Sequence, residues 1–197
     1  RKEAIASLNL TPNSVVLDVA CGVGFNFKII ESYLQGDGKL IEVDISSESL
    51  KEAERRIMKH EWTNIELVNE SIIDYKPKIQ FDAILCTFAL EIIPDYKAAI
   101  DRICDVLKPH GRFTMIGMKL TSRRLYRLLN PFFEWLYRRG GIDVHRDIIP
   151  YVTSKFNEIE YYEECFFYSL HVLNVFFQAS YLGRHPASYW KENVLVP

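Results

Sequence analysis

Short apolar runs alternate with amphipathic stretches along the N-terminal part of the chain. The apolar runs predict buried strands over 15–19, 39–45, 65–68, 81–87 and 112–118. The stretches between them predict helices over about 25–34, 46–60 and 94–107, and residues 1–8 resemble the end of a further helix. Ser46 is expected as a helix N-cap, and Pro94 as the first residue of its helix. Strands that alternate with helices predict a parallel sheet with right-handed crossovers.

The C-terminal part adds two apolar runs, over 159–167 and 170–177. Because a very short turn separates them, these two strands must be antiparallel. The whole pattern predicts an α/β fold, a Rossmann-like doubly wound seven-stranded sheet that is mostly parallel and has a C-terminal antiparallel hairpin. We expect a single domain over residues 1–197.

An insertion at about 119–156 separates the fifth and sixth predicted strands and is longer than a simple crossover needs. Its apolar side chains form one helical stripe, made of Leu125, Leu128, Leu129, Phe132, Phe133 and Leu136. Pro131 should split or kink this helix. Three interpretations stay open: a helical lid over the site, a peripheral membrane contact through 122–139, or a contact with a second copy or partner. Trp135, Tyr126 and Tyr137, with flanking arginines, suit a membrane surface with anionic headgroups.

Composition narrows the class of protein. Of 197 residues, 48% are apolar and 25% charged, and the net charge of −2 provides no basic surface for nucleic acid. The four cysteines form no CxxC pair and the five histidines share no metal-ligand spacing, so we expect a cytoplasmic protein without a metal. No apolar run is long enough to span a membrane. The sequence begins at Arg1 rather than Met, and we expect residues to precede it in the native protein.

Candidate chemistry gathers at the carboxyl ends of the strands, where an open parallel sheet binds its ligand. Gly22 and Gly24 follow the first strand and allow a tight turn, and Asp44 ends the second strand at a spacing suited to ribose hydroxyls. Phe27 stands where a dinucleotide fingerprint needs glycine, and Asp18 would repel a pyrophosphate. These features disfavour an NAD-dependent oxidoreductase and favour a cationic ligand such as S-adenosylmethionine.

The segments VLDVACGVG, LIEVDIS, NIELVNESIID, FDAILCTFALEIIPD and LKPHGRFTMIGM resemble the successive motifs of class I S-adenosylmethionine-dependent methyltransferases. The resemblance covers residues 11–118 and extends to the closing hairpin at about 157–178. It implies an enzyme that transfers a methyl group from S-adenosylmethionine to an acceptor and releases S-adenosylhomocysteine. The fold it implies is one class I methyltransferase domain.

The resemblance also implies a set of cofactor-binding residues: Asp18, Ala20, Cys21, Gly22, Gly24, Asp44, Ile45, Ser71, Ile72, Cys86 and Thr87. Of these, Asp18, Ala20, Gly22 and Gly24 frame the methionine part. Asp44 holds the ribose hydroxyls and Ile45 flanks the adenine. Cys86 and Thr87 face the methionine part and the reactive methyl group. Ser71 departs from the family, which usually has an acidic residue there, so either Ser71 or Glu70 is expected at the adenine edge. Ala20 stands where glycine is commoner. Cys21 and Cys86 are also expected as buried packing residues.

The segment LYRLLNPFFEWLYRRGG is similar in composition to a region of bacterial phospholipid and quinone methyltransferases. This likeness implies an apolar or lipid-like acceptor, and a soluble small molecule is the alternative. If the acceptor needs a base, Glu91 and His145 are the candidates. CTFALEIIPD lacks the Asn/Asp-Pro-Pro-aromatic signature of amino-group methylation on nucleobases or glutamine.

A second functional class is an S-adenosylmethionine-binding protein without transferase activity, acting as a regulator or an inactive partner subunit. The missing acid at Ser71 is the feature that favours it. The acceptor, the atom methylated and the oligomeric state stay open at this point.

Overall fold

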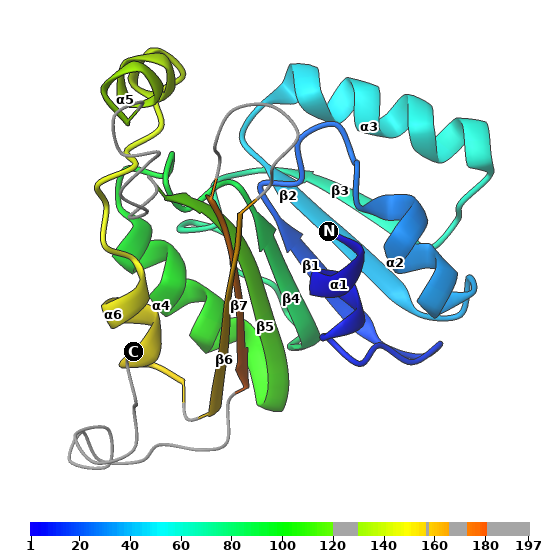
Figure 1. Cartoon of the computed structure of the whole chain (residues 1–197). Helices are drawn as coiled ribbons and strands as arrows, with labels where there is room; N and C mark the ends of the chain where they lie inside the picture. Colours follow the sequence, from blue (N-terminus) through cyan, green and yellow to red (C-terminus); the bar gives the residue numbers. More distant parts are fainter. Residues whose placement is uncertain (120–129, 157, 166–172, 181–197) are drawn as a thin grey trace.

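A computed structural model describes residues 1–119, 130–156, 158–165 and 173–180 of the chain. Its centre is a parallel five-stranded sheet in the order β3-β2-β1-β4-β5 (Figure 1). The strands are β1 (Val15–Val19), β2 (Lys39–Asp44), β3 (Ile65–Asn69), β4 (Phe81–Thr87) and β5 (Leu107–Lys119). The reversal of strand order beside β1 creates the switch point at which such sheets bind ligands. The predicted Rossmann-like α/β class is thereby confirmed.

Helices cover both faces of this sheet (Figure 1). On one face lie α1 (Lys2–Ala6), α2 (Phe27–Leu34) and α3 (Ser47–His60), and on the other lie α4 (Tyr96–Val106) and α6 (Ile149–Thr153). Successive residues of β1 point to opposite faces, so Val16 packs with α1–α3 while Leu17 packs with α4. β1 therefore contributes apolar side chains to both faces of the sheet, with Asp18 as the buried exception.

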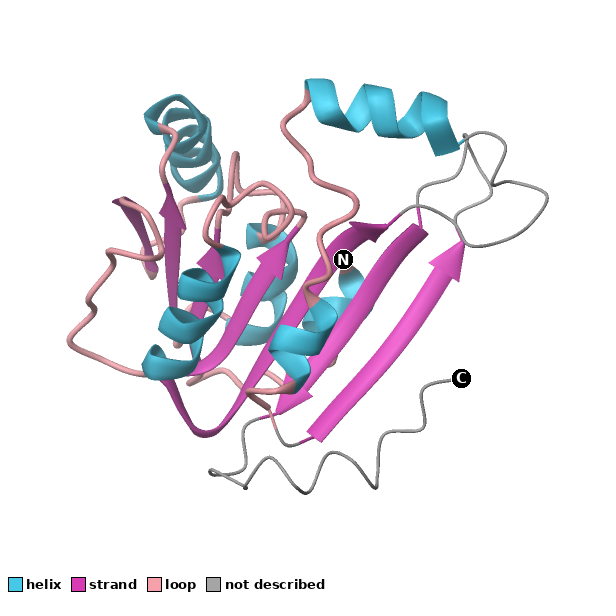
Figure 2. Cartoon of the chain, turned by 90° about the vertical axis from the view of Figure 1, so that its left-hand side faces the viewer, coloured by secondary structure: helices cyan, strands magenta, loops and turns pink. Residues whose placement is uncertain are grey.

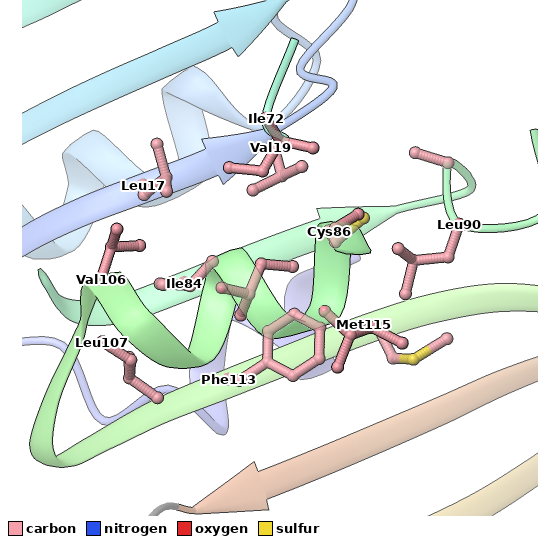
Figure 3. Packing of buried hydrophobic residues seen from close by; sticks show 14 of the residues in the cluster. Leu17, Val19, Ile72, Ile84, Cys86, Leu90, Val106, Leu107, Phe113 and Met115 are labelled. Carbon is pink, nitrogen blue, oxygen red and sulfur yellow. The ribbon is translucent and has the colours of Figure 1, made fainter. Parts of the chain in front are cut away.

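The layer under α4 and α6 is the larger apolar cluster (Figure 3). Phe113 of β5 is fully buried there and stacks on Phe156, with ring centroids 5.4 Å apart. Ile84 and Cys86 of β4 lie in the same layer. This packing brings the chain after α6 against the sheet and fixes the far end of the insertion.

Two boundaries of secondary-structure elements differ from the sequence prediction. The fourth helix begins at Tyr96 rather than at Pro94, because the carboxylate of Asp95 accepts a hydrogen bond from the amide of Ala98 at 3.0 Å and so caps the helix there. Residues 108–111 fall between the predicted helix over 94–107 and the predicted strand over 112–118. They belong to the start of β5, where the pairing register with β4 shifts and His110 adopts a positive φ of 66°.

Within the insertion, the structure describes α5 (Asn130–Arg139) and α6, a short helix that the apolar pattern did not predict. Helix α5 stands apart from the sheet, beyond the carboxyl ends of its strands (Figure 2). Residues 120–129, which include Leu125, Leu128 and Leu129 of the predicted stripe, lie outside the described residues.

Beyond the insertion, β6 (Glu158–Cys165) and β7 (Leu173–Ser180) extend the sheet, with β7 antiparallel to both β5 and β6. The predicted strands were 159–167 and 170–177, and the expected turn between them falls in 166–172, outside the described residues.

Candidate functional site

A cavity of about 300 Å³ opens at the carboxyl edge of the sheet, between the loops that follow β1, β2, β3 and β4. Five predicted cofactor residues line it: Ala20, Asp44, Ile45, Ser71 and Ile72. The opposite wall is apolar and includes Phe88 and Ile92, which the sequence analysis missed. A mostly apolar slot whose lining includes the carboxylates of Asp44 and Glu70 suits a planar ring that carries a sugar.

The turn after β1 runs through left-handed backbone. The φ angles are 53° at Ala20, 60° at Gly22 and 80° at Gly24. A Cβ on Gly24 would also come within 2.5 Å of the Phe27 ring, so glycine is required there on two grounds. Ala20 adopts a conformation that favours glycine, which agrees with its position in the motif.

Asp44 holds this turn in place. Its Oδ2 accepts a hydrogen bond from the amide of Gly22 at 2.8 Å, and its Oδ1 accepts one from the amide of Ser46 at 2.8 Å. Ser46 in turn caps α3, because its hydroxyl accepts from the amide of Ser49. A carboxylate has about four acceptor positions, so Asp44 can hold both amides and still accept from a pair of ribose hydroxyls.

Beneath the turn lies a pair of buried carboxyl groups. Asp18 of β1 and Glu42 of β2 occupy paired positions on adjacent strands, and neither is exposed to solvent. Burial raises the pKa of Asp18 to about 7, and the hydrogen bond from Asn26 and the charge of Arg1 oppose that rise. Burial and the neighbouring Asp18 raise the pKa of Glu42 well above its ordinary value. The pair therefore holds a proton at neutral pH.

Glu42 could have been noticed in the sequence, because it is a lone carboxylate inside the apolar run LIEVD. Asn26 was missed as well. Its side-chain amide donates to Asp18 Oδ2 at 2.7 Å, and its carbonyl oxygen accepts from the Arg1 guanidinium at 2.7 Å. In the sequence, an asparagine one residue before a helix indicates only a helix cap. The hydrogen bonds by which Asn26 links Arg1 to Asp18 could not be predicted without the structure.

The remaining predicted cofactor residues lie around and below the cavity rather than on its wall: Asp18, Cys21, Gly22, Gly24, Cys86 and Thr87. Cys86 belongs to the apolar core (Figure 3). Burial raises the pKa of the Cys86 thiol and of the Cys21 thiol. Both cysteines are thus packing residues. The hydroxyl of Thr87, at the end of β4, accepts from the Arg1 guanidinium at 2.8 Å.

The two candidate bases lie in different surroundings. Glu91 is buried in the turn after β4, and its carboxylate lies so close to Gly117 of β5 that a Cβ there would overlap Oε1. His145 has a largely exposed ring, and its Nε2 lies 3.1 Å from the carboxylate of Glu134 on α5, beside a separate cavity of about 220 Å³. Neither Glu91 nor His145 lines the cavity that contains Asp44.

In the part of the chain that the structure describes, no group of three or more histidine, cysteine or acidic side chains is arranged to hold a metal ion. Within that same part, no helix has the length and apolar character needed to cross a membrane.

Comparison with protein families agrees with this geometry. Residues 10–166 match the model of the methyltransferase domain. The chain belongs to this family. Curated relatives include demethylmenaquinone methyltransferases of Lactiplantibacillus plantarum, 28% identical over 142 residues, and of Symbiobacterium thermophilum, 26% identical over 151 residues. Each alignment covers 71% of this chain but only 58% and 60% of the relatives, so the chain spans less than two thirds of their length.

Solved structures share the fold. The YcgJ protein of Bacillus subtilis is 15% identical with a TM-score of 0.75, and the alignment covers 91% of this chain and 97% of that one. Phosphoethanolamine N-methyltransferase 2 of Haemonchus contortus, in complex with S-adenosyl-L-methionine, is 16% identical with a TM-score of 0.73, covering 92% of this chain and 52% of that one. At these identities the likeness establishes the architecture, and the methyltransferase class rests on the family match.

Proposed function

We propose that this protein is an S-adenosylmethionine-dependent methyltransferase and that the cavity beside Asp44 receives the cofactor's adenosine. The observation that carries the proposal is the carboxylate of Asp44, which fixes the glycine turn through Gly22 and stands at the edge of an apolar slot. This arrangement meets the needs of a ribose joined to a purine, and membership of the methyltransferase domain family supports it.

The adenine ring is expected between Ile45 and the apolar wall that contains Ile72 and Phe88. The Ser71 hydroxyl already accepts a hydrogen bond from the amide of Ile73 at 3.3 Å, in the turn that follows β3. Glu70 also lines the cavity. We therefore assign the contact with the adenine amino group to Glu70 rather than to Ser71, which accounts for the departure from the family's acidic residue.

Methyl transfer is an in-line displacement. A lone pair of the acceptor forms a bond to the methyl carbon while the carbon–sulfur bond breaks, and its electrons neutralise the sulfonium to give S-adenosylhomocysteine. Holding the acceptor in line with that bond supplies much of the acceleration. An acceptor that loses a proton needs a base. Of the two candidates we favour Glu91, because it lies in the turn after β4 that also contributes Phe88 and Ile92 to the cavity wall.

An apolar or lipid-like acceptor is favoured by two observations. The curated relatives carry the name demethylmenaquinone methyltransferase. Helix α5 exposes Phe132, Trp135 and Leu136 by 53%, 51% and 45%, and the Arg139 guanidinium lies 4.4 Å above the Trp135 ring. We propose that segment 122–139 touches a membrane surface, where aromatic and basic side chains are both stabilised. A small amine is the alternative acceptor, as in the phosphoethanolamine enzyme named above.

The domain is proposed to be a single unit over residues 1–197. In it, β6 and β7 complete a seven-stranded class I sheet and the insertion at about 119–156 forms a lid at the acceptor side. This lid role and the membrane contact are compatible, because a helix at the mouth of the site can do both.

The competing function is cofactor binding without methyl transfer, for which the serine at position 71 is the supporting feature. Calorimetric titration of S-adenosylmethionine and S-adenosylhomocysteine into the protein and its Asp44→Ala variant tests the binding. We expect micromolar affinity that is strongly weakened in the variant. Transfer of a labelled methyl group to quinols in vesicles or to a pool of small amines then separates an enzyme from a binding protein. Absence of binding by the intact protein would refute both functions.

A further inference from the structure

We propose that Arg1 binds the carboxylate of the amino-acid part of S-adenosylmethionine. The inference deepens the proposed function, because it assigns the partner of one charged group of the cofactor. Neither the motifs nor the family match singles out this residue, which lies before the first matched position.

Arg1 is held at the site by neutral acceptors. Its Nη1 donates to Asn26 Oδ1 at 2.7 Å and to Thr87 Oγ1 at 2.8 Å. Thr87 ends β4, and Asn26 follows the glycine turn after β1. The guanidinium therefore lies across the gap between the carboxyl ends of the two central strands, where the methionine part is expected.

The ring of Phe88 connects Arg1 with the adenosine cavity. The Arg1 guanidinium lies 5.2 Å from the centroid of Phe88, and Phe88 lines that cavity. The Arg1 guanidinium also lies 5.9 Å from the centroid of the Phe25 ring. A ligand that extends from the cavity past Phe88 along the glycine turn reaches Arg1 at its far end.

Arg1 offsets negative charge around the glycine turn. Asp44 and the pair of Asp18 and Glu42, which keeps a proton at neutral pH, lie close to that turn, and Asp18 and Arg1 interact electrostatically. These groups suit the ammonium and the sulfonium of the cofactor but repel its carboxylate. A guanidinium is planar and matches a carboxylate in a bidentate geometry. Arg1 thus gives the zwitterionic end of the ligand a positive partner beside the negative ones.

Arg56 provides a matched control. It lies on α3 with its guanidinium 4.9 Å from the Phe25 ring, so it shares an aromatic neighbour with Arg1. No hydrogen bond to Asn26 or Thr87 is formed by Arg56 in the described structure. Replacing it removes the same charge at nearly the same place without touching the proposed contact.

The test compares S-adenosylmethionine with decarboxylated S-adenosylmethionine, which keeps the sulfonium and the ammonium but lacks the carboxylate. Dissociation constants are measured by calorimetry for the unsubstituted protein and for Arg1→Met, Arg1→Lys and Arg56→Met. The intact protein should prefer the carboxylated ligand by about tenfold to a hundredfold, as expected for a charge-assisted pair. Arg1→Met should lose this preference through weaker binding of S-adenosylmethionine alone. Arg1→Lys should keep part of it, and Arg56→Met all of it.

An unchanged preference in Arg1→Met would overturn the inference and leave the proposed function intact. Equal weakening of both ligands would also overturn it, because Arg1 would then act only by holding Asn26 and Asp18 in place. Thermal unfolding of each variant identifies such a general loss of structure. If the intact protein bound neither ligand, the proposed function itself would fail.

Discussion

The buried pair of Asp18 and Glu42 makes stability depend on pH in a direction opposite to that of a carboxylate whose pKa is lowered by an ion pair. Asp18 has a pKa raised from 3.8 to about 7. Between these values the folded protein keeps a proton that the unfolded chain releases, so stability falls as pH rises through this window and levels off above about pH 7. The rise in pKa corresponds to about 4 kcal/mol in the free energy of unfolding.

Asp18→Asn removes the titrating group and keeps an oxygen that can accept from Asn26. We expect the free energy of unfolding of the variant, relative to the wild type, to increase by about 4 kcal/mol between about pH 4 and about pH 8. Urea unfolding at a series of pH values measures this difference. Asp37→Asn, in the exposed turn before β2, serves as the control. A difference that stays constant with pH, or that decreases, would refute the argument.

Three further substitutions test other parts of the fold. Gly117→Ala should displace the Glu91 carboxylate, because the new Cβ would overlap Oε1, so methyl transfer should fall while cofactor affinity, measured by calorimetry, is retained. Phe113→Ala should lower the free energy of unfolding by about 3–5 kcal/mol in urea titrations, since the ring is fully buried and stacks on Phe156; a loss below about 1 kcal/mol would contradict this packing. Ser46→Ala should remove the cap of α3 and cost about 1 kcal/mol, whereas Ser46→Asp should restore it.

The strand positions could be predicted because the central strands are mostly buried and mostly apolar, and a single carboxylate such as Asp18 or Glu42 does not hide such a run. β1 and β4 have the bounds that the sequence predicted. The boundaries of the helices were harder to predict. Pro94 is a strong signal for a first helical residue, yet the Asp95 side chain caps the helix one residue later, and two reasonable start signals in succession cannot be ranked from sequence.

The shape of the turn after β1 was predictable from local motifs, because Gly22 and Gly24 adopt left-handed backbone and Asp44 accepts from the amide of Gly22. Prediction failed where the contact depends on residues that are distant in sequence. Arg1 and Thr87 are 86 positions apart, and no pattern near either residue indicates the other. The placement of His145 beside Glu134 follows from how the insertion folds back, which the apolar stripe did not specify.

Asp44 accepts hydrogen bonds from the amide of Gly22 and the amide of Ser46. The two amides should therefore exchange their hydrogens with solvent slowly when no cofactor has been added, at rates close to those of the central strands rather than of a surface loop. A binding turn that is already ordered loses little conformational entropy when the cofactor enters. The Asp44 carboxylate thus orders the glycine turn by itself. Replacing it would increase the mobility of that turn as well as remove the proposed contact with the ribose.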